Sequence, residues 1–326
     1  MLNLVALSVL SGLTLAAAVY FLRISWIKLA GWLRGLLASS LGVLVFAWAL
    51  VSYAVLIEPE TLIVRRVEIV SAHWRGAPLT VAAIGDTHVG GPHMDAARVG
   101  RVVRRINSLR PDLVVVLGDY VYGHEPEGAR SASANQEILN GVATLAAINA
   151  RYGVVAVLGN HDGWYGRETI TEALQNAGAA ALWNRSVTIH RSGGEIVVAG
   201  IADAWTGHPD FTEALNGAPV GADTIVLSHN PDPFVNIPPG PAVMLAAHTH
   251  CGQVTIPFVG RPFLPIHHKE FACGRIDRRG QTLYVNGGIG TSIVPARFLN
   301  PPEITLITIR AAGNADIFPP RPRSRN

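Results

Sequence analysis

The chain has 326 residues, of which 49% are hydrophobic and only 15% are charged, with a formal net charge of +3. This composition is too apolar for an ordinary soluble enzyme and indicates that part of the chain lies in lipid. The basic residues form no long run of the kind that binds nucleic acid, so we expect no nucleic-acid partner. Two cysteines exclude a disulfide scaffold and a cysteine-rich zinc fold.

The N-terminal residues 1–60 are expected to form a membrane anchor. Residues 2–22 and 35–57 carry no charge, and each stretch reaches the roughly 20 residues that a helix needs to cross a bilayer. The short connector between them contains Arg23, Lys28 and Arg34, with Trp26 and Trp32 beside them. Basic loops favour the cytoplasmic side and tryptophan favours the interface, so we expect a multi-pass hairpin in the cell membrane, with the remaining chain extracytoplasmic.

Two alternatives for this region are a signal peptide and a buried soluble hairpin. No positively charged region precedes residues 2–22 and no clear cleavage site follows them, which disfavours a signal peptide. The two uncharged stretches are therefore interpreted as transmembrane helices.

Residues 64–312 are expected to form one α/β domain. A strand at 80–84, a helix at 96–109, a strand at 113–117, a helix at 136–149 and a strand at 154–158 indicate a βαβ arrangement with partly parallel strands. Later strands are expected with fewer helices, at 186–190, 196–201, 224–227, 243–246, 282–285 and 304–309. This distribution favours a two-sheet α/β sandwich. Residues 313–326 are rich in proline and arginine and are expected to form a disordered tail.

A polar cluster follows each of five predicted strands. The clusters contain Asp86 and His88; Asp119; Asn160, His161 and Asp162; His229; and His248 and His250. Ligands of α/β sheets gather at the carboxyl ends of strands, so these clusters are expected to converge. Carboxylate, amide and imidazole groups together suit divalent transition metals.

The series GDTH, GD, GNHD, SH and AHTH resembles the calcineurin-like metallophosphoesterase superfamily, whose fold is a two-sheet α-β-β-α sandwich. The later segments GQVTIPF and NGGIGTSIVPARFLNPPEITLITI resemble its membrane-anchored bacterial branch, typified by YaeI and YkuE. This resemblance implies a site for two divalent metal ions, with manganese, zinc and iron all suitable.

The resemblance also implies a role for each polar residue. One metal would be held by Asp86, His88 and His250, and the other by Asn160, His229 and His248. Asp119 would bridge the two ions. His161 would act on the phosphate or the leaving group, with Asp162 as its orienting partner. The ions would activate a water molecule for in-line attack on a phosphodiester.

Cys251 departs from the pattern of this branch, which usually has glycine after the His-x-His pair. The residue is interpreted as a passive substitution, the alternatives being a soft metal ligand or a disulfide with Cys273.

Three further residues are candidates for substrate binding. Asp203 and His208 lie with Trp205 in a loop after a predicted strand and are candidates to line the cleft, the alternative being a structural loop. Arg297 follows a glycine-rich turn and is a candidate phosphate contact.

The membrane anchor makes a phospholipid or a lipid-linked pyrophosphate a plausible substrate. The alternative functions are a phosphomonoesterase or protein phosphatase, and a non-catalytic metal-bearing membrane scaffold. A transporter is disfavoured because the two helices contain no intramembrane charge.

Overall fold

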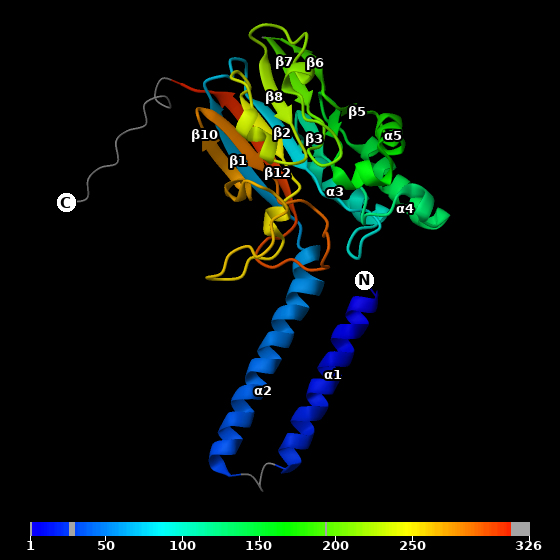
Figure 1. Cartoon of the computed structure of the whole chain (residues 1–326), viewed down its shortest axis with the longest axis vertical. Helices are drawn as coiled ribbons and strands as arrows, with labels where there is room; N and C mark the ends of the chain where they lie inside the picture. The colour runs from blue at the N-terminus through cyan, green and yellow to red at the C-terminus, as the bar shows by residue number, and fades with distance from the viewer. Residues whose placement is uncertain (1, 26–29, 193, 314–326) are drawn as a thin grey trace, which may run out of the picture.

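The structure is a computed structural model that describes residues 2–25, 30–192 and 194–313. Two long helices project from one end of an α/β domain (Figure 1). The predictions for Trp26, Lys28 and the tail at 314–326 concern residues outside the described ranges.

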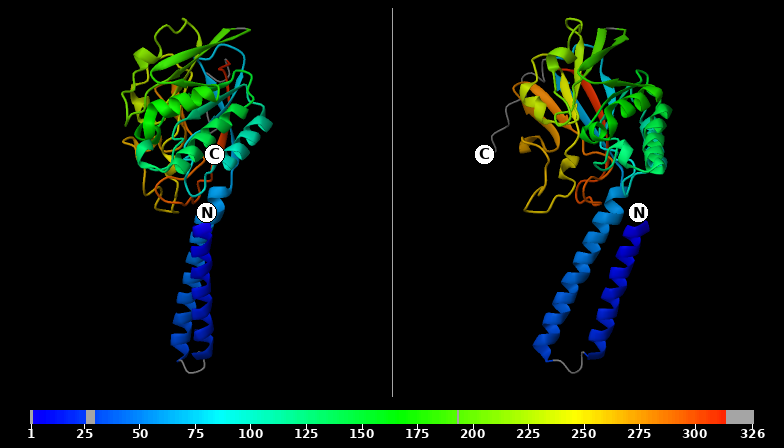
Figure 2. Two further views of the ribbon diagram at one scale, coloured as in Figure 1. Left: turned by 90° about the vertical axis from the view of Figure 1, so that its right-hand side faces the viewer. Right: turned by 45° about the vertical axis from the view of Figure 1, so that its right-hand side comes forward.

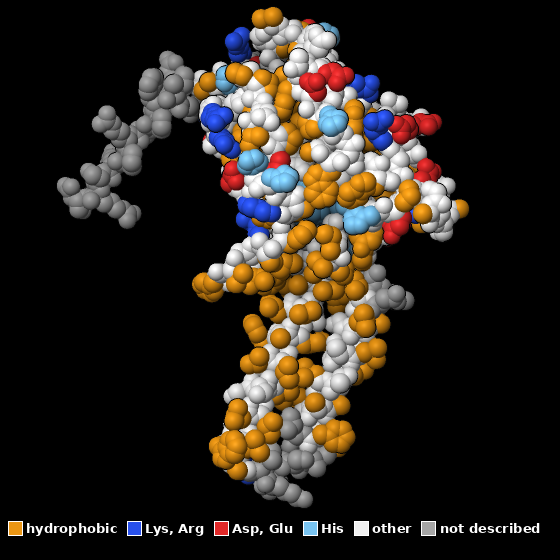
Figure 3. Space-filling model, viewed as in Figure 1, with side chains coloured by type: hydrophobic (Ala, Val, Ile, Leu, Met, Phe, Trp, Pro, Cys, Tyr) orange, Lys and Arg blue, Asp and Glu red, His pale blue; other side chains and the backbone are white. Residues whose placement is uncertain are grey.

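The two N-terminal helices, α1 (Leu2–Ser25) and α2 (Gly31–Ser52), lie beside each other away from the domain. By length and composition, Leu4–Phe21 and Gly31–Glu60 could each cross a membrane, and neither span is buried in the protein. Trp48 Nε1 of α2 donates a hydrogen bond to Ser11 Oγ of α1 at 3.0 Å. Hydrophobic side chains cover much of the outer surface of both helices (Figure 3). The helices are not part of the domain core, so the alternative of a buried soluble hairpin is wrong.

The end of α2 is joined firmly to the domain. The helix continues through short turns at Tyr53–Ile57 (η2) and Glu58–Glu60 (η3). The buried carboxylate of Glu58 accepts hydrogen bonds from the backbone N–H groups of Leu299 and Asn300, at 3.0 and 2.6 Å. These bonds fix the chain near residue 300 against the domain end of the helix.

The first sheet has the strand order β1-β12-β2-β3-β4-β5. Its strands are β1 (Ile63–Ser71), β2 (Leu79–Ile84), β3 (Leu113–Leu117), β4 (Val154–Val157), β5 (Ala179–Leu182) and β12 (Glu303–Ala311). Strands β2 to β5 are parallel to one another, as the βαβ prediction requires, while β12 is antiparallel to β2.

The second sheet has the order β10-β11-β9-β8-β7-β6. Its strands are β6 (Arg185–Arg191), β7 (Gly194–Gly200), β8 (Asp223–Leu227), β9 (Val243–Ala246), β10 (Gly274–Arg278) and β11 (Gln281–Val285). The four central strands β7, β8, β9 and β11 are parallel, and the two edge strands β6 and β10 are antiparallel to their neighbours.

The two sheets face each other and enclose an apolar core between them, as predicted for a sandwich (Figures 1 and 2). In β3 every residue is buried: Leu113, Val115 and Leu117 face the second sheet, and Val114 and Val116 face the helices. A strand buried on both faces requires such a continuous apolar run.

Helices cover the outer face of the first sheet. They are α3 (Ala96–Leu109), α4 (Ala132–Ala143) and α5 (Asn160–Asn176). The outer face of the second sheet is covered by the short helix α6 (Phe211–Ala214), the turn η6 (Asp232–Asn236) and the segment around Phe271. The second helical layer of the expected α-β-β-α sandwich is therefore reduced to short elements.

Strand register determines which end of the first sheet faces the N-terminal helices. β1 begins just after η3 and pairs in parallel with β12, with Ile63 opposite Glu303. Because β12 is antiparallel to β2, the beginning of β12 lies beside the carboxyl end of β2, with Thr305 opposite Ala83. The carboxyl ends of β2, β3 and β4 therefore lie at the end of the domain that joins α2.

Candidate metal centre

The predicted metal ligands converge where the carboxyl ends of strands from both sheets meet. Asp86 and His88 follow β2, Asp119 follows β3, and Asn160 begins α5 directly after β4. The second sheet supplies His229 after β8 and both His248 and His250 after β9. All seven side chains are buried.

One group of ligand atoms comes from Asp86, His88 and His250. Their ligand atoms all lie within 4.8 Å of one another, and His88 Nε2 is 3.1 Å from His250 Nε2. Two imidazole nitrogens at this separation can both face one ion, and the carboxylate adds a hard donor.

A second group comes from Asp119, His229 and His248. His229 Nε2 lies 3.0 Å from His248 Nδ1 and 3.1 Å from Asp119 Oδ2. Asn160 lines the same cavity as Asp119 and His248 and can add its amide oxygen to this group.

Asp119 is placed between the two groups. Its Oδ2 atom lies 3.1 Å from His229 Nε2 and 3.8 Å from His88 Nε2, which belong to different imidazole pairs. Its Oδ1 atom accepts a hydrogen bond from the backbone N–H of His161 at 2.9 Å. This bond fixes the carboxylate while Oδ2 faces both groups.

Two buried oxygen atoms show that the donor set fits metal ions. Asp86 Oδ2 and Asn160 Oδ1 have no hydrogen-bond partner in the part of the chain that the structure describes. A buried oxygen without a partner destabilises a fold by about 1–3 kcal/mol, unless a cation replaces the lost water. One such oxygen lies in each predicted ligand set.

Backbone carbonyl groups orient the imidazole rings. Leu117 O accepts from His229 Nδ1 at 2.7 Å, and Val121 O accepts from His88 Nδ1 at 3.1 Å. Because a carbonyl oxygen only accepts, these rings carry their proton on Nδ1 and direct the lone pair of Nε2 to the centre. Pro265 O holds His248 Nε2 in the same way, at 3.0 Å, and leaves Nδ1 for the centre.

Without a metal ion, the imidazoles of the centre differ in charge: those of His88 and His248 are neutral, and that of His229 is protonated beside the Asp119 carboxylate. Burial lowers the pKa of His88 and of His248 to about 3, so both rings are neutral at neutral pH. Although burial raises the pKa of Asp119, the imidazoles of His229 and His161 outweigh it and hold this pKa well below its usual range. Burial would lower the pKa of His229, but the carboxylate of Asp119 raises it to about 10. A positive charge beside Asp119 is therefore strongly favoured.

The backbone at the ligands is strained. Asp86, His88, Asp119, His248 and His250 all have positive φ angles, between 48° and 68°. Non-glycine residues rarely adopt this conformation, and such residues cluster at functional sites. Gly159 permits the close approach of two of these loops, because a Cβ atom there would lie 2.2 Å from Asp119 Oδ1.

His161 lies beside the centre, but the prediction that Asp162 orients its ring is wrong. The His161 ring donates from Nδ1 to Gly123 O at 2.7 Å, and its Nε2 is 3.9 Å from Asp119 Oδ2. The Asp162 carboxylate instead accepts from the backbone N–H groups of Gly159, Asp119 and Tyr120, each at 2.8 Å. Asp162 therefore joins the loops that carry Asp119 and Asn160 and does not orient His161.

Arg297 is not exposed to the cleft, contrary to its prediction as a phosphate contact. Its guanidinium is fully buried and donates to the carbonyl groups of Gly287, Gly290 and Asn300. Its Nη2 atom also lies 3.3 Å from His250 Nδ1, on the side of the ring away from His88. Arg297 therefore contacts the predicted ligand His250 on the ring nitrogen that faces away from the centre.

The loop with Asp203 and His208 matches the structural alternative at both residues. Asp203 is buried and accepts from the backbone N–H groups of Trp205 and Thr206, both at 2.9 Å. His208 is exposed and lies outside the residues that line the cleft. Trp205 does line the cleft.

The cleft over the centre has a volume of about 510 Å³ and largely apolar walls. One wall is aromatic: His124 and Trp164 have ring centroids 4.9 Å apart, and Trp205 lies 4.9 Å from His248. The sequence prediction missed His124 and Trp164. Trp164 follows His161 by three residues, which would place it on the same helical face if α5 had been recognised.

Cys251 forms a disulfide with Cys273. The interpretation of Cys251 as a passive substitution is therefore wrong, and a thiolate ligand is excluded as well. The bond joins the residue after His250 to the segment before β10, so it braces the chain beside a predicted ligand.

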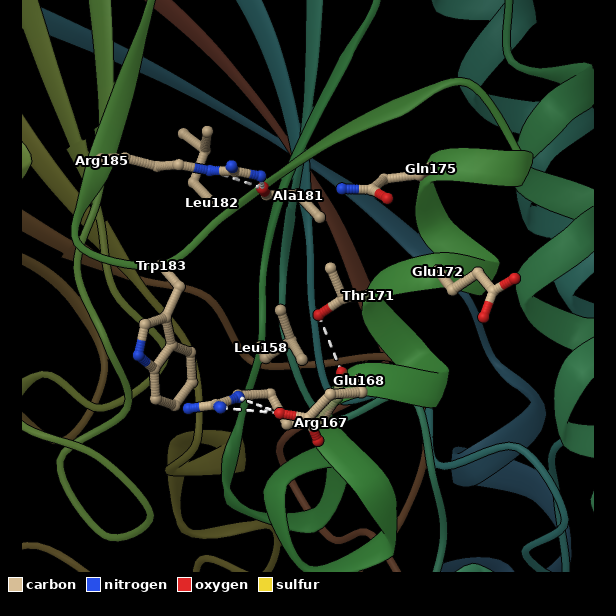
Figure 4. A pocket seen from close by; sticks show the side chains of 10 residues that line it. All are labelled: Leu158, Arg167, Glu168, Thr171, Glu172, Gln175, Ala181, Leu182, Trp183 and Arg185. Carbon is tan, nitrogen blue, oxygen red and sulfur yellow. Dashed lines mark hydrogen bonds and ion pairs between the residues drawn. The ribbon is translucent and has the colours of Figure 1, made fainter.

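A second surface pocket lies between α5 and β5 (Figure 4). Arg167 lies over the Trp183 ring at 5.1 Å and pairs with Glu168 at 2.7 Å, while Arg185 donates to Ala181 O. Among the described residues, those lining this pocket include none of the predicted metal ligands.

The sequence of the chain is similar to those of several metallophosphoesterases. Over 213 residues the chain is 30% identical to the uncharacterized metallophosphoesterase YkuE of Bacillus subtilis, a match covering 64% of this chain and 72% of that protein. It is 31% identical over 204 residues to the phosphodiesterase YaeI of Escherichia coli, covering 61% and 71%. It is 29% identical over 255 residues to a transmembrane protein with a metallophosphoesterase domain of Danio rerio, covering 72% and 54%. The family model for calcineurin-like phosphoesterases matches residues 79–252, more than half of the chain, which therefore belongs to this family.

Proposed function

We propose that the chain is a membrane-anchored phosphodiesterase that depends on two divalent metal ions. The observation that carries this proposal is the position of Asp119 Oδ2, within 3.8 Å of ring nitrogens from two separate imidazole pairs. A shared carboxylate oxygen is the arrangement that holds two ions close together.

Asp86, His88 and His250 would hold the first ion, Asn160, His229 and His248 would hold the second, and Asp119 would be shared by both. Each set contains one of the buried unpartnered oxygens, Asp86 Oδ2 or Asn160 Oδ1. The mixture of oxygen and imidazole donors suits manganese, zinc or iron. Ions held there would polarise the phosphate and activate a water molecule for in-line attack.

His161 is the side chain assigned to proton transfer. Its Nδ1–H is held by Gly123 O, so Nε2 is the ring atom available to the substrate. A proton on Nε2 would stabilise charge on the phosphate or pass to the departing alkoxide oxygen. Water supplies the nucleophile in this scheme, so no covalent phosphoenzyme is expected.

The walls of the cleft favour a diester over a monoester. Among the described residues, none of those that line the cleft is lysine or arginine. A phosphomonoester carries more negative charge than a diester at neutral pH and would gain from such cations. Bulky apolar walls instead suit a phosphate that carries an organic group on each side. The relative YaeI is described as a phosphodiesterase, which supports the same choice.

The membrane placement is proposed from the two apolar helices and the charge of their connector. Arg23 and Arg34 flank that connector, which favours the cytoplasm for it and an extracytoplasmic domain. The Cys251–Cys273 disulfide supports this orientation, because such bonds persist in oxidising compartments.

The test uses the full-length chain, purified in detergent and supplied with manganese. We expect hydrolysis of bis-p-nitrophenyl phosphate, and faster turnover of this diester than of p-nitrophenyl phosphate. Absence of hydrolysis with manganese, zinc, iron and cobalt in turn would contradict the enzyme assignment. A clear preference for the monoester would contradict the diester assignment alone.

A further inference from the structure

Two loops at the helix end of the domain expose large apolar side chains. We name this surface the apolar rim and define it by Phe258, Val259, Phe263, Ile293, Val294 and Leu299. Phe258 is fully exposed, and Val259 and Ile293 are 72% and 64% exposed. A contiguous exposed apolar surface of this kind marks an interaction site.

The charge distribution of the rim is one-sided. Residues 252–266 and 286–302 contain no acidic residue. Arg261 is the exposed cation of the first loop, and its Nε donates to Cys251 O at 2.7 Å. Apolar side chains together with a basic residue suit the interface of an anionic bilayer.

Backbone pairing unites the two loops into one surface. Thr255 N donates to Phe298 O at 2.8 Å, and Phe298 N donates to Gln253 O at 3.0 Å. The Cys251–Cys273 disulfide closes the first loop at its base. The rim is thus held in place by covalent and hydrogen bonds.

The rim is continuous with the domain end of α2. Arg297 N donates to Ala54 O at 2.8 Å, and the ring of Phe298 lies 6.5 Å from that of Tyr53. In the space-filling view, hydrophobic side chains gather at the base of the domain, where the helices join it (Figure 3). A bilayer that contains α2 would reach this surface.

The rim also forms part of the wall of the cleft. Phe263, Ile293 and Val294 line the cavity that contains Asp119 and His161. An apolar chain attached to a phosphate at the metal centre could therefore leave the cleft along this wall, toward the helix end of the domain.

We propose that the apolar rim lies in the interface of the bilayer that holds the helices. The cleft then takes phosphodiesters whose hydrocarbon chains remain in that bilayer. This inference rests on the proposed function for its reaction and on the proposed anchor for its membrane. Continuity with α2 and the lack of acidic residues in 252–266 and 286–302 favour lipid over a second copy of the chain.

The position of the rim is tested with a fluorescent label. Both cysteines are in the disulfide, so Phe258→Cys provides one reactive thiol under non-reducing conditions. The full-length variant is labelled with a nitrobenzoxadiazole dye and reconstituted into vesicles of phosphatidylethanolamine and phosphatidylglycerol. We expect nitroxide-bearing phospholipids to quench this label. The matched control is Val220→Cys, which is also fully exposed but lies just before β8, at the strand end opposite His229.

Equal, weak quenching at positions 258 and 220 would overturn the inference. Blue-shifted emission at position 258 that disappears on dilution, without quenching by nitroxide lipids, would assign the rim to a second copy and also overturn it. Neither result depends on catalysis, so this test is separate from that of the proposed function.

The role in substrate access is tested with the double variant Phe258→Glu and Val259→Glu. We expect unchanged hydrolysis of bis-p-nitrophenyl phosphate but about tenfold slower hydrolysis of phosphatidylglycerol in vesicles, because charge on the rim weakens its contact with lipid. Val220→Glu should change neither rate. Loss of activity on both substrates, or on neither, would contradict this role. If the unmodified chain hydrolyses the soluble diester but not the vesicle lipid, the lipid substrate class is wrong while the proposed phosphodiesterase stands.

Discussion

Asp119 Oδ2 lies 3.1 Å from one imidazole pair and 3.8 Å from the other, so a change at this residue should affect both halves of the metal centre. We predict that Asp119→Asn, which keeps the shape and removes the negative charge, lowers the content of both ions together. Activity on bis-p-nitrophenyl phosphate should fall by more than about a hundredfold. Mutation of a residue that only hydrogen-bonds to a metal ligand already costs about 10–100-fold in activity, and loss of a direct ligand should cost more. Elemental analysis after gel filtration measures the metal content.

The control for this variant is Asp210→Asn. Asp210 is an exposed carboxylate that caps α6 and accepts from the N–H groups of Thr212 and Glu213. The Asp210→Asn variant should retain its full metal content. Retention of two tightly bound ions by Asp119→Asn would contradict the bridging assignment.

His161 is assigned to proton transfer rather than to metal binding, and the two roles give different outcomes. We predict that His161→Ala retains both ions and lowers kcat by about 10²–10⁴-fold, the usual range for a general acid or base. Steady-state kinetics and elemental analysis on the same preparation separate the roles. Loss of one ion would instead make His161 a ligand, as its 3.9 Å distance from Asp119 would allow.

Residue types and spacing predicted which side chains meet at the metal centre, but not the contacts of the residues around it. Asp162 follows His161 directly, yet its carboxylate points to the backbone of the neighbouring loop, because it caps the first turn of α5. Arg297 follows a glycine-rich turn, a sequence context that suits a phosphate contact, yet it is buried behind His250. The direction of a side chain depends on loop geometry, which local sequence does not determine.

Among the links between secondary-structure elements, the disulfide is the one whose removal has the clearest expected effect. Cys251 and Cys273 are separated by 22 residues, and the segment between them contains part of the apolar rim. On the chain-entropy estimate, closing a loop of this length stabilises the fold by about 3 kcal/mol. We predict that the double variant Cys251→Ala and Cys273→Ala has a lower thermal unfolding midpoint and a lower metal affinity, since Cys251 adjoins His250.

Thermal unfolding and metal titration measure these effects, and reducing agent provides the control. Reductant should lower the midpoint of the unmodified chain toward that of the double variant and leave the double variant unchanged. An unaltered midpoint in the double variant would show that the bond contributes little to the stability of this region.

The strands predicted from apolar runs were confirmed within one or two residues, and the missed elements have physical reasons. β5 is the run Ala179–Leu182, whose three alanines favour a helix, but parallel pairing with β4 makes it a strand. β10 is short, charged and at a sheet edge. β1 carries Arg65, Arg66 and Glu68, and it pairs with a strand about 240 residues further along the chain. Such long-range pairing leaves little trace in the local sequence.

In the whole molecule, the fold places the predicted metal ligands and the two apolar helices at the same end of the domain. The register of β1, β12 and β2 sets the carboxyl ends of β2, β3 and β4 beside the domain end of α2. The apolar helices and the order of the polar clusters were predictable from sequence. Their proximity was not, because it depends on β12 lying between β1 and β2, parallel to the first and antiparallel to the second.

The proposed orientation of the whole chain in the membrane rests on the charges that flank the connector. Arg23 lies in the last turn of α1 and Arg34 in the first turn of α2, so the connector should lie in the cytoplasm and the domain outside it. We predict that alkaline phosphatase fused to the C-terminus is active in a bacterial host, because this enzyme requires an oxidising compartment. The same reporter inserted after Ala30 should be inactive, whereas a cytoplasmic fluorescent protein inserted there should fluoresce. The opposite pattern at the two positions would reverse the topology, and it would place the Cys251–Cys273 bond in a reducing compartment, where both thiols should react with maleimide.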